Sequence, residues 1–155
     1  MKKPVLILIT LLISFSANAQ IPESFLGKWE GIGTLYNSEA TFSMEWEQVL
    51  NQQFYHLSFS NALNNGAFSM SAHGYYRTEG DSITGQWFDT RGVSFPLRGV
   101  TKEHKLIIHW GTLDFEQGKT EYSLVSNDSM EVTDFVLKNG EYAQFGNATY
   151  QRKLN

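Results

Sequence analysis

The chain has no cysteine, which excludes disulfides, thiol catalysis and cysteine-ligated metal centres. Its 12 basic and 16 acidic side chains give a formal net charge of −4 without a basic run, so neither nucleic acid nor an anionic lipid surface is an expected partner. The nucleophile elbow of the α/β-hydrolases, the phosphate-binding glycine loop and the zinc motif His-Glu-x-x-His are also missing. We therefore predict no cofactor and no metal, and the sequence points to no particular class of enzyme.

The N-terminus has the pattern of a secretory signal peptide. Lys2 and Lys3 precede an apolar run over residues 4–15, and Ser-Ala-Asn-Ala at 16–19 provides a small-residue cleavage site. The apolar run is too short to span a bilayer, and no other segment is apolar enough. We expect residues 1–19 to be a signal peptide and residues 20–155 to be one periplasmic or secreted bacterial domain.

The remainder reads as strands separated by closely spaced turns. Nine turn signals divide it into ten strand-like runs without helical periodicity, apart from one helical turn expected over residues 22–26. This spacing predicts an all-β, antiparallel up-and-down meander that closes into a barrel of roughly ten strands. The turns are expected at residues 37–38, 51–52, 64–66, 80–81, 90–92, 103–104, 116–118, 127–128 and 139–140.

Two-residue turns fix which side chains share a face in the first five runs. One face is then apolar, and the other collects serine, threonine, glutamate and histidine. On the polar face we expect His56 and His73 to form a surface pair, with metal binding by the two imidazoles as the alternative. The predicted cross-strand pairs are Trp29–Trp46, Gly31–Met44, Gly33–Phe42, Trp46–Leu57 and Trp87–Gly74.

The second half of the chain sorts less cleanly, so a polar spot inside the barrel is expected there. His109 stands between Ile108 and Trp110 and is predicted to be a buried, hydrogen-bonded histidine. Asp134 shares a face with valines and is expected to be partly buried, which requires a cation or several donors. Arg98 is the basic side chain considered as its partner.

Aromatic residues make up 14% of the chain and must either fill a core or line a cavity. Trp46, Trp87 and Tyr76 lie on the expected inner face. Because ten strands enclose more space than side chains fill easily, we weigh a cavity for a small apolar or planar ligand against a completely filled barrel.

The run Gly27 to Gly33 resembles the Gly-x-Trp signature of the calycin superfamily, which includes lipocalins and fatty-acid-binding proteins. The resemblance implies that Trp29 packs at the closed end of a barrel beneath a basic residue of the last strand, here Arg152. The run is also similar to that of nitrobindin-type haem barrels, but no histidine follows His109, so a haem role is not implied.

Further segments resemble an uncharacterised bacterial family of lipocalin-like barrels related to DUF1579. That family implies a fold and no particular activity. The segments are Gly27–Gly31, Met44–Trp46, Gly85–Trp87, Trp110–Gly111, Gly118–Thr120 and Val132–Phe135.

These observations predict an exported lipocalin-like barrel that binds a small hydrophobic or aromatic molecule. Two alternatives stay open: an enzyme with a small polar site formed by His109, Asp134 and Arg98, and a protein-interaction module that uses the polar outer face. The predicted ligand-binding residues are Trp46, Tyr76, Trp87, Arg98, His109, Trp110, Tyr122 and Asp134.

Overall fold

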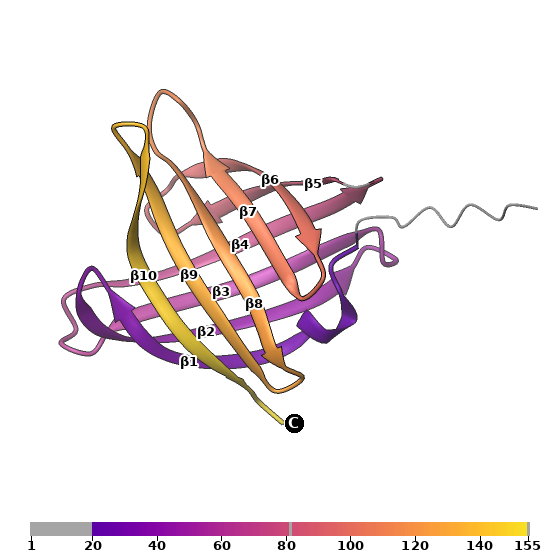
Figure 1. The fold of residues 1–155 in the computed structure, drawn as a ribbon, viewed down its shortest axis with the longest axis horizontal. Helices are drawn as coiled ribbons and strands as arrows, with labels where there is room; N and C mark the ends of the chain where they lie inside the picture. Colours follow the sequence, from indigo (N-terminus) through magenta and orange to yellow (C-terminus); the bar gives the residue numbers. More distant parts are fainter. Residues whose placement is uncertain (1–19, 81, 155) are drawn as a thin grey trace, which may run out of the picture.

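The computed structural model describes residues 20–80 and 82–154, and within them it contains a closed antiparallel barrel of ten strands (Figure 1). Each strand pairs with its neighbours in sequence, and the first pairs with the last. The predicted all-β, up-and-down barrel is confirmed, whereas the predicted signal peptide lies outside the described residues. The elements are η1 Glu23–Phe25, β1 Gly27–Leu35, β2 Ser38–Val49, β3 Phe54–Leu63, β4 Ser69–Glu79, β5 Ser82–Asp89, β6 Ser94–Lys102, β7 Lys105–Gly111, β8 Gln117–Ser126, β9 Ser129–Lys138 and β10 Glu141–Arg152.

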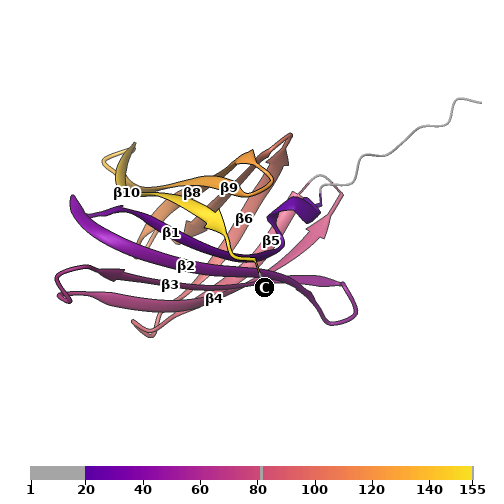
Figure 2. The ribbon, with the colours of Figure 1, turned by 90° about the horizontal axis from the view of Figure 1, so that it is seen from below.

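Successive loops alternate between the two ends of the barrel (Figures 1 and 2). The loops β1–β2, β3–β4, β5–β6, β7–β8 and β9–β10 gather at one end, which we call the open end. The other four loops lie at the closed end, together with η1 and the end of β10. No helix among the described residues is long and apolar enough to cross a membrane.

The first turn lies one residue earlier than predicted. Tyr36 and Asn37 both have positive φ, 50° and 62°, which is the geometry of a two-residue hairpin turn. Trp29 therefore pairs with Met44 instead of Trp46, and Gly31 pairs with Phe42 instead of Met44. A shift of two residues leaves every side chain on its predicted face.

The later pairings in the first half agree with the prediction. Trp46 faces Leu57, and Trp87 faces Gly74. The β7–β8 loop differs, because it spans residues 112–116 instead of 116–118. Gly118 lies inside β8, where a Cβ would overlap the ring of Trp110, so this glycine accommodates a core side chain and does not form a turn.

The closed end is filled as the calycin resemblance implies. Phe25 and Trp29 are both fully buried, and the indole nitrogen of Trp29 donates a 2.9 Å hydrogen bond to the carbonyl oxygen of Phe25. The guanidinium of Arg152 covers the Trp29 ring, with its carbon 4.1 Å from the ring centroid. The predicted helical turn is present as η1 and contributes Phe25 to the core.

The glycines of β1 act on β10 and not on β2. A Cβ at Gly31 would press on the ring of Tyr150, and one at Gly33 would overlap the carbonyl oxygen of Asn147. The predicted pairs placed these glycines against Met44 and Phe42 of β2, whereas the atoms closest to them belong to β10. These glycines allow β1 and β10 to approach where the barrel closes.

The predicted surface histidine pair is present on the outer wall. Nε2 of His56 lies 2.9 Å from Nδ1 of His73, and Nδ1 of His56 lies 2.8 Å from a carboxylate oxygen of Glu47. Both nitrogens of His56 are thus engaged within the protein. The described residues contain no group of three histidine, cysteine or acidic side chains arranged to hold a metal ion.

Candidate functional site

The barrel contains a cavity on the open-end side of its core, with a volume of about 100 Å³ open to water-sized spheres. This space exceeds the roughly 10–15 Å³ that one water requires on this measure, so it admits several waters or one small ring. Its lining comes from the loops and inward faces of both halves of the barrel. The aromatic lining residues are Tyr36, Phe59, Phe68, Tyr76, Trp87, Phe95, Trp110, Tyr122 and Phe145.

The two cavity tryptophans are held in place by hydrogen bonds from their indole nitrogens. Trp87 donates to a carboxylate oxygen of Asp89 at 3.1 Å, and Trp110 donates to the hydroxyl of Thr120 at 3.2 Å. Phe95 stacks on Trp110 with the ring centroids 5.9 Å apart. These aromatic walls are therefore fixed by the protein itself and form a preorganised apolar surface.

Two acidic residues line the cavity, Glu116 at its mouth and Asp134 deeper inside. Asp134 belongs to a chain of hydrogen bonds. The hydroxyl of Thr120 donates a 2.6 Å hydrogen bond to its Oδ1, which continues the chain that begins at the Trp110 indole. Burial raises the pKa of Asp134 to about 6, against a smaller lowering by the Thr120 hydrogen bond. Asp134 is thus mostly ionised at neutral pH while it faces an apolar cavity.

A further polar atom in the lining has no partner. Asn61 is only 7% exposed, and its side-chain oxygen is buried. This oxygen accepts no hydrogen bond from the described residues. An unsatisfied buried amide oxygen is costly, typically by about 1–3 kcal/mol. Asn61 lies on β3, across the barrel from Asp134 on β9 (Figure 1).

The mouth of the cavity carries a small charged cluster. Arg91 in the β5–β6 loop bonds Asp89 at 2.8 Å and Glu116 of the β7–β8 loop at 3.4 Å, and thereby ties the two loops together. Burial raises the pKa of Asp89, but the hydrogen bonds from Arg91 and Trp87 outweigh it and lower the pKa overall. Tyr36, on the other side of the mouth, stacks on Phe145 at 5.4 Å.

The structure separates the predicted site residues into three groups. Five of them line the cavity together. One of the five, Asp134 on β9, lies where a polar spot was expected, inside the second half of the barrel. Trp46 is fully buried beneath the cavity, with its ring centroid 5.0 Å from that of Tyr76, and does not line it. The five cavity residues are Tyr76, Trp87, Trp110, Tyr122 and Asp134.

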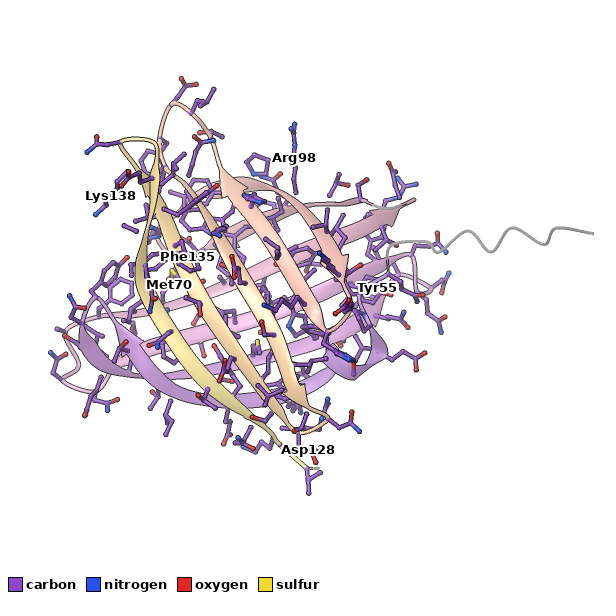
Figure 3. All side chains as sticks on the ribbon, viewed as in Figure 1. Tyr55, Met70, Arg98, Asp128, Phe135 and Lys138 are labelled. Atoms are coloured by element: carbon purple, nitrogen blue, oxygen red, sulfur yellow. The ribbon has the colours of Figure 1, made fainter. Side chains whose placement is uncertain are left out.

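Arg98 and His109 lie on the outer wall instead of inside. Both are exposed and pair across β6 and β7, and Figure 3 shows Arg98 pointing away from the barrel. The prediction of a buried His109 was wrong: Ile108 and Trp110 face inward, so the residue between them faces outward, where its Nδ1 lies 3.2 Å from the hydroxyl of Tyr142. An internal site that combines His109, Asp134 and Arg98 is contradicted.

Sequence reasoning missed several polar residues of the site. Thr120 could have been found, because it shares the inward face of β8 with Tyr122. Asn61 shares its face of β3 with Leu57 and Phe59, but an asparagine near a strand end gives no signal of burial. Arg91 and Glu116 lie in or beside loops, where alternation predicts nothing.

A ten-stranded up-and-down barrel whose closed end holds a tryptophan beneath an arginine has a calycin-like, or lipocalin-like, fold. Among solved structures, the S-type phycobiliprotein lyase of Guillardia theta is similar, with a TM-score of 0.60 and 12% identity over 86% of this chain and 90% of that one. The structure titled EF1p2_mFAP2b bound to DFHBI matches with a TM-score of 0.44 and 12% identity over 84% and 95%.

At this identity the likeness concerns the fold alone. No family model matches the chain, and no curated protein does. The resemblance to the DUF1579-related barrels therefore stays a prediction.

Proposed function

We propose that this chain is an exported calycin-like barrel that binds a small molecule with an aromatic or apolar body in its cavity. The observation that carries the proposal is the unfilled space between ordered aromatic walls, which also presents the unpaired oxygen of Asn61. A barrel that needed only a core would gain stability by filling this space and by replacing the asparagine. Export rests on the signal-peptide pattern at residues 1–19.

The size of the cavity limits the ligand. With about 100 Å³ of free space, the barrel encloses one ring and a short substituent, while a longer ligand would project through the mouth beside Arg91. The similar fold of a phycobiliprotein lyase is compatible with ligand binding in such a barrel but does not identify this ligand.

The test is binding of two small neutral ring compounds, indole and 2-phenylethanol. Isothermal titration calorimetry measures both, and tryptophan fluorescence measures 2-phenylethanol, because free indole itself emits like tryptophan. Trp87 and Trp110 line the cavity, so a bound ring changes their emission. In Val132→Phe, the larger side chain should fill the cavity and abolish binding, because Val132 is a buried lining residue.

The matched control is Val100→Phe, which makes the same exchange at a position that is 47% exposed. It should leave both affinities unchanged. Binding that survives in Val132→Phe would place the ligand elsewhere and contradict the proposal.

A further inference from the structure

We infer that the cavity selects a protonated amine attached to a small ring or apolar body, with the Asp134 carboxylate as its counter-ion. This inference rests on the proposed function and narrows the ligand to a chemical class. It begins from a charge imbalance in the lining. Among the described residues, Asp134 takes part in no salt bridge, and its Oδ1 accepts one hydrogen bond, from Thr120.

A lone carboxylate is expensive in an apolar cavity unless a cation joins it. Among the described residues, Arg91 is the only basic side chain in the lining, and its guanidinium is already engaged by Asp89 and Glu116. The part of the chain that the structure describes therefore provides no cation to balance the Asp134 charge. A cationic ligand would supply the missing charge.

The surroundings of Asp134 favour an ammonium group over an uncharged donor. Trp110, Tyr122 and Phe145 line the same cavity and present aromatic rings, which attract cations through their π-faces. Trp110 and Phe145 stand edge to face, with centroids 6.4 Å apart, and thus form two sides of an aromatic corner. A carboxylate beside such a corner combines two features that recognise organic ammonium ions.

The charges at the mouth of the cavity also favour a cationic ligand. Asp89 and Glu116 together bring two carboxylates for the single guanidinium of Arg91, so the entrance carries a net negative charge. A cation is attracted through such an entrance, whereas an anion is repelled. On β3, the unpaired oxygen of Asn61 offers a second acceptor to an N–H group that reaches across the cavity.

Near neutral pH the tyrosines around Asp134 stay neutral, so Asp134 is the group in this neighbourhood whose charge changes. Tyr122 on β8 and Tyr150 on β10 are buried, and burial and the Asp134 charge both raise the pKa of these phenols, so they stay neutral. Burial, followed by the charge of Glu116, also raises the pKa of Tyr36 at the mouth, while Arg91 opposes the rise. Because burial holds the pKa of Asp134 at about 6, its carboxylate is available above that pH and lost below it.

The experiment compares three ligands of matched size at pH 7.5: 2-phenylethylamine, 2-phenylethanol and 3-phenylpropionate. The amine should bind at least about tenfold more tightly than the alcohol, as expected for a charge-assisted hydrogen bond, and the carboxylate should bind most weakly. In Asp134→Asn, the amine should lose this advantage while the alcohol keeps its affinity. Asp114→Asn, at an exposed aspartate of the β7–β8 loop, is the control and should change neither.

A second measurement uses the wild-type protein alone, in case Asp134→Asn does not fold. Lowering the pH from 7.5 to 5 protonates Asp134 while the amine stays charged, so the amine should weaken several-fold and the alcohol should not. An alcohol that binds as tightly as the amine, or an amine affinity that survives both changes, overturns the inference and leaves the proposed function intact. If neither these three ligands nor indole binds, the proposed function fails together with the inference.

Discussion

Arg152, the last residue of β10, lies across the indole of Trp29 near the start of β1, with 4.1 Å between the guanidinium carbon and the ring centroid. Its nitrogens also donate to the carbonyl oxygens of Leu26, Ser24 and Asn127, at 2.6, 2.6 and 2.8 Å. One side chain thus joins η1 to the first and last strands and to the β8–β9 loop.

Replacing Arg152 should therefore destabilise the barrel strongly. Arg152→Ala removes the cation–π contact and leaves several carbonyl oxygens without donors, so we expect a loss of about 2–4 kcal/mol in the free energy of unfolding. Arg152→Lys keeps the charge but loses the planar fork, and should recover less than half of that loss. Urea denaturation measures both variants.

Arg77→Ala is the control for these variants, because Arg77 forms an ion pair with Glu79 in which both side chains are more than half exposed. It should change the free energy of unfolding by less than about 0.5 kcal/mol. A similar value for Arg152→Ala would show that the closed end does not depend on this arginine.

Gly33 tests the close approach of β1 to β10. In Gly33→Ala the added methyl group meets the backbone carbonyl of Asn147, which cannot move without disturbing the closing pair of strands. We expect a loss of about 2–4 kcal/mol, typical of severe overpacking. Ile32→Ala, at the neighbouring position, is the control because Ile32 is 73% exposed, and thermal unfolding should rank Gly33→Ala far below it.

The cavity carboxylate should cost stability at neutral pH. Because the folded-state pKa of Asp134 is about 6, above its ordinary value of 3.8, the folded protein holds a proton there that the unfolded chain releases between these values. Its contribution to the free energy of unfolding therefore falls as the pH rises from about 4 to 6 and stays low above 6. Asp134→Asn should be more stable than wild type at pH 7.5, by about 1–3 kcal/mol, and the difference should shrink towards pH 4.

Comparing wild type with Asp134→Asn at each pH cancels the opposite contribution of Asp89, whose pKa is lowered in the folded state by its hydrogen bonds with Arg91 and Trp87 despite the opposing effect of burial. Urea denaturation at pH 4, 5, 6 and 7.5 supplies the values. A variant that is less stable than wild type at pH 7.5 would mean that the protein compensates the Asp134 charge by itself.

Export is checked on the processed protein. Expressed from its full-length gene in a bacterial host, the chain should appear in the periplasm or medium with Gln20 as its first residue, and Ala19→Asp should block processing because the cleavage site requires a small residue. N-terminal sequencing and intact mass decide the outcome. An unprocessed chain confined to the cytoplasm would contradict the proposed export.

The agreement between sequence and structure is greatest where alternation and short turns act together. Trp46–Leu57 and Trp87–Gly74 were predicted correctly, because Asn51-Gln52 and the glycine turns fix the register of the neighbouring strands. The β1–β2 register was wrong by two residues, because a tyrosine in the left-handed region is unfavourable by itself. In the structure, the Tyr36 amide donates a hydrogen bond to the carbonyl of Phe145 in β10. Because β10 lies far away in the sequence, the local pattern around Tyr36 does not reveal this contact.

The site was predictable only as a region. Alternation identified inward aromatic residues and an inward Asp134. His109 was misassigned because its apolar sequence neighbours Ile108 and Trp110 both face inward, which places the residue between them on the outer wall. The ion pair between Arg91 and Glu116 at the cavity mouth depends on two loops that meet only after the barrel has formed. No local pattern encodes such a contact.

The pairing of β1 with β10 has a consequence for the order in which the molecule folds. The contacts between Trp29 and Arg152 and between Gly33 and Ala148 join segments more than 100 residues apart, so no partial chain emerging from the ribosome can complete them. Contacts of such long range also make folding slow. The newly made polypeptide therefore cannot close its barrel until the final strand is available, so the ring of ten strands forms as one late event and not strand by strand.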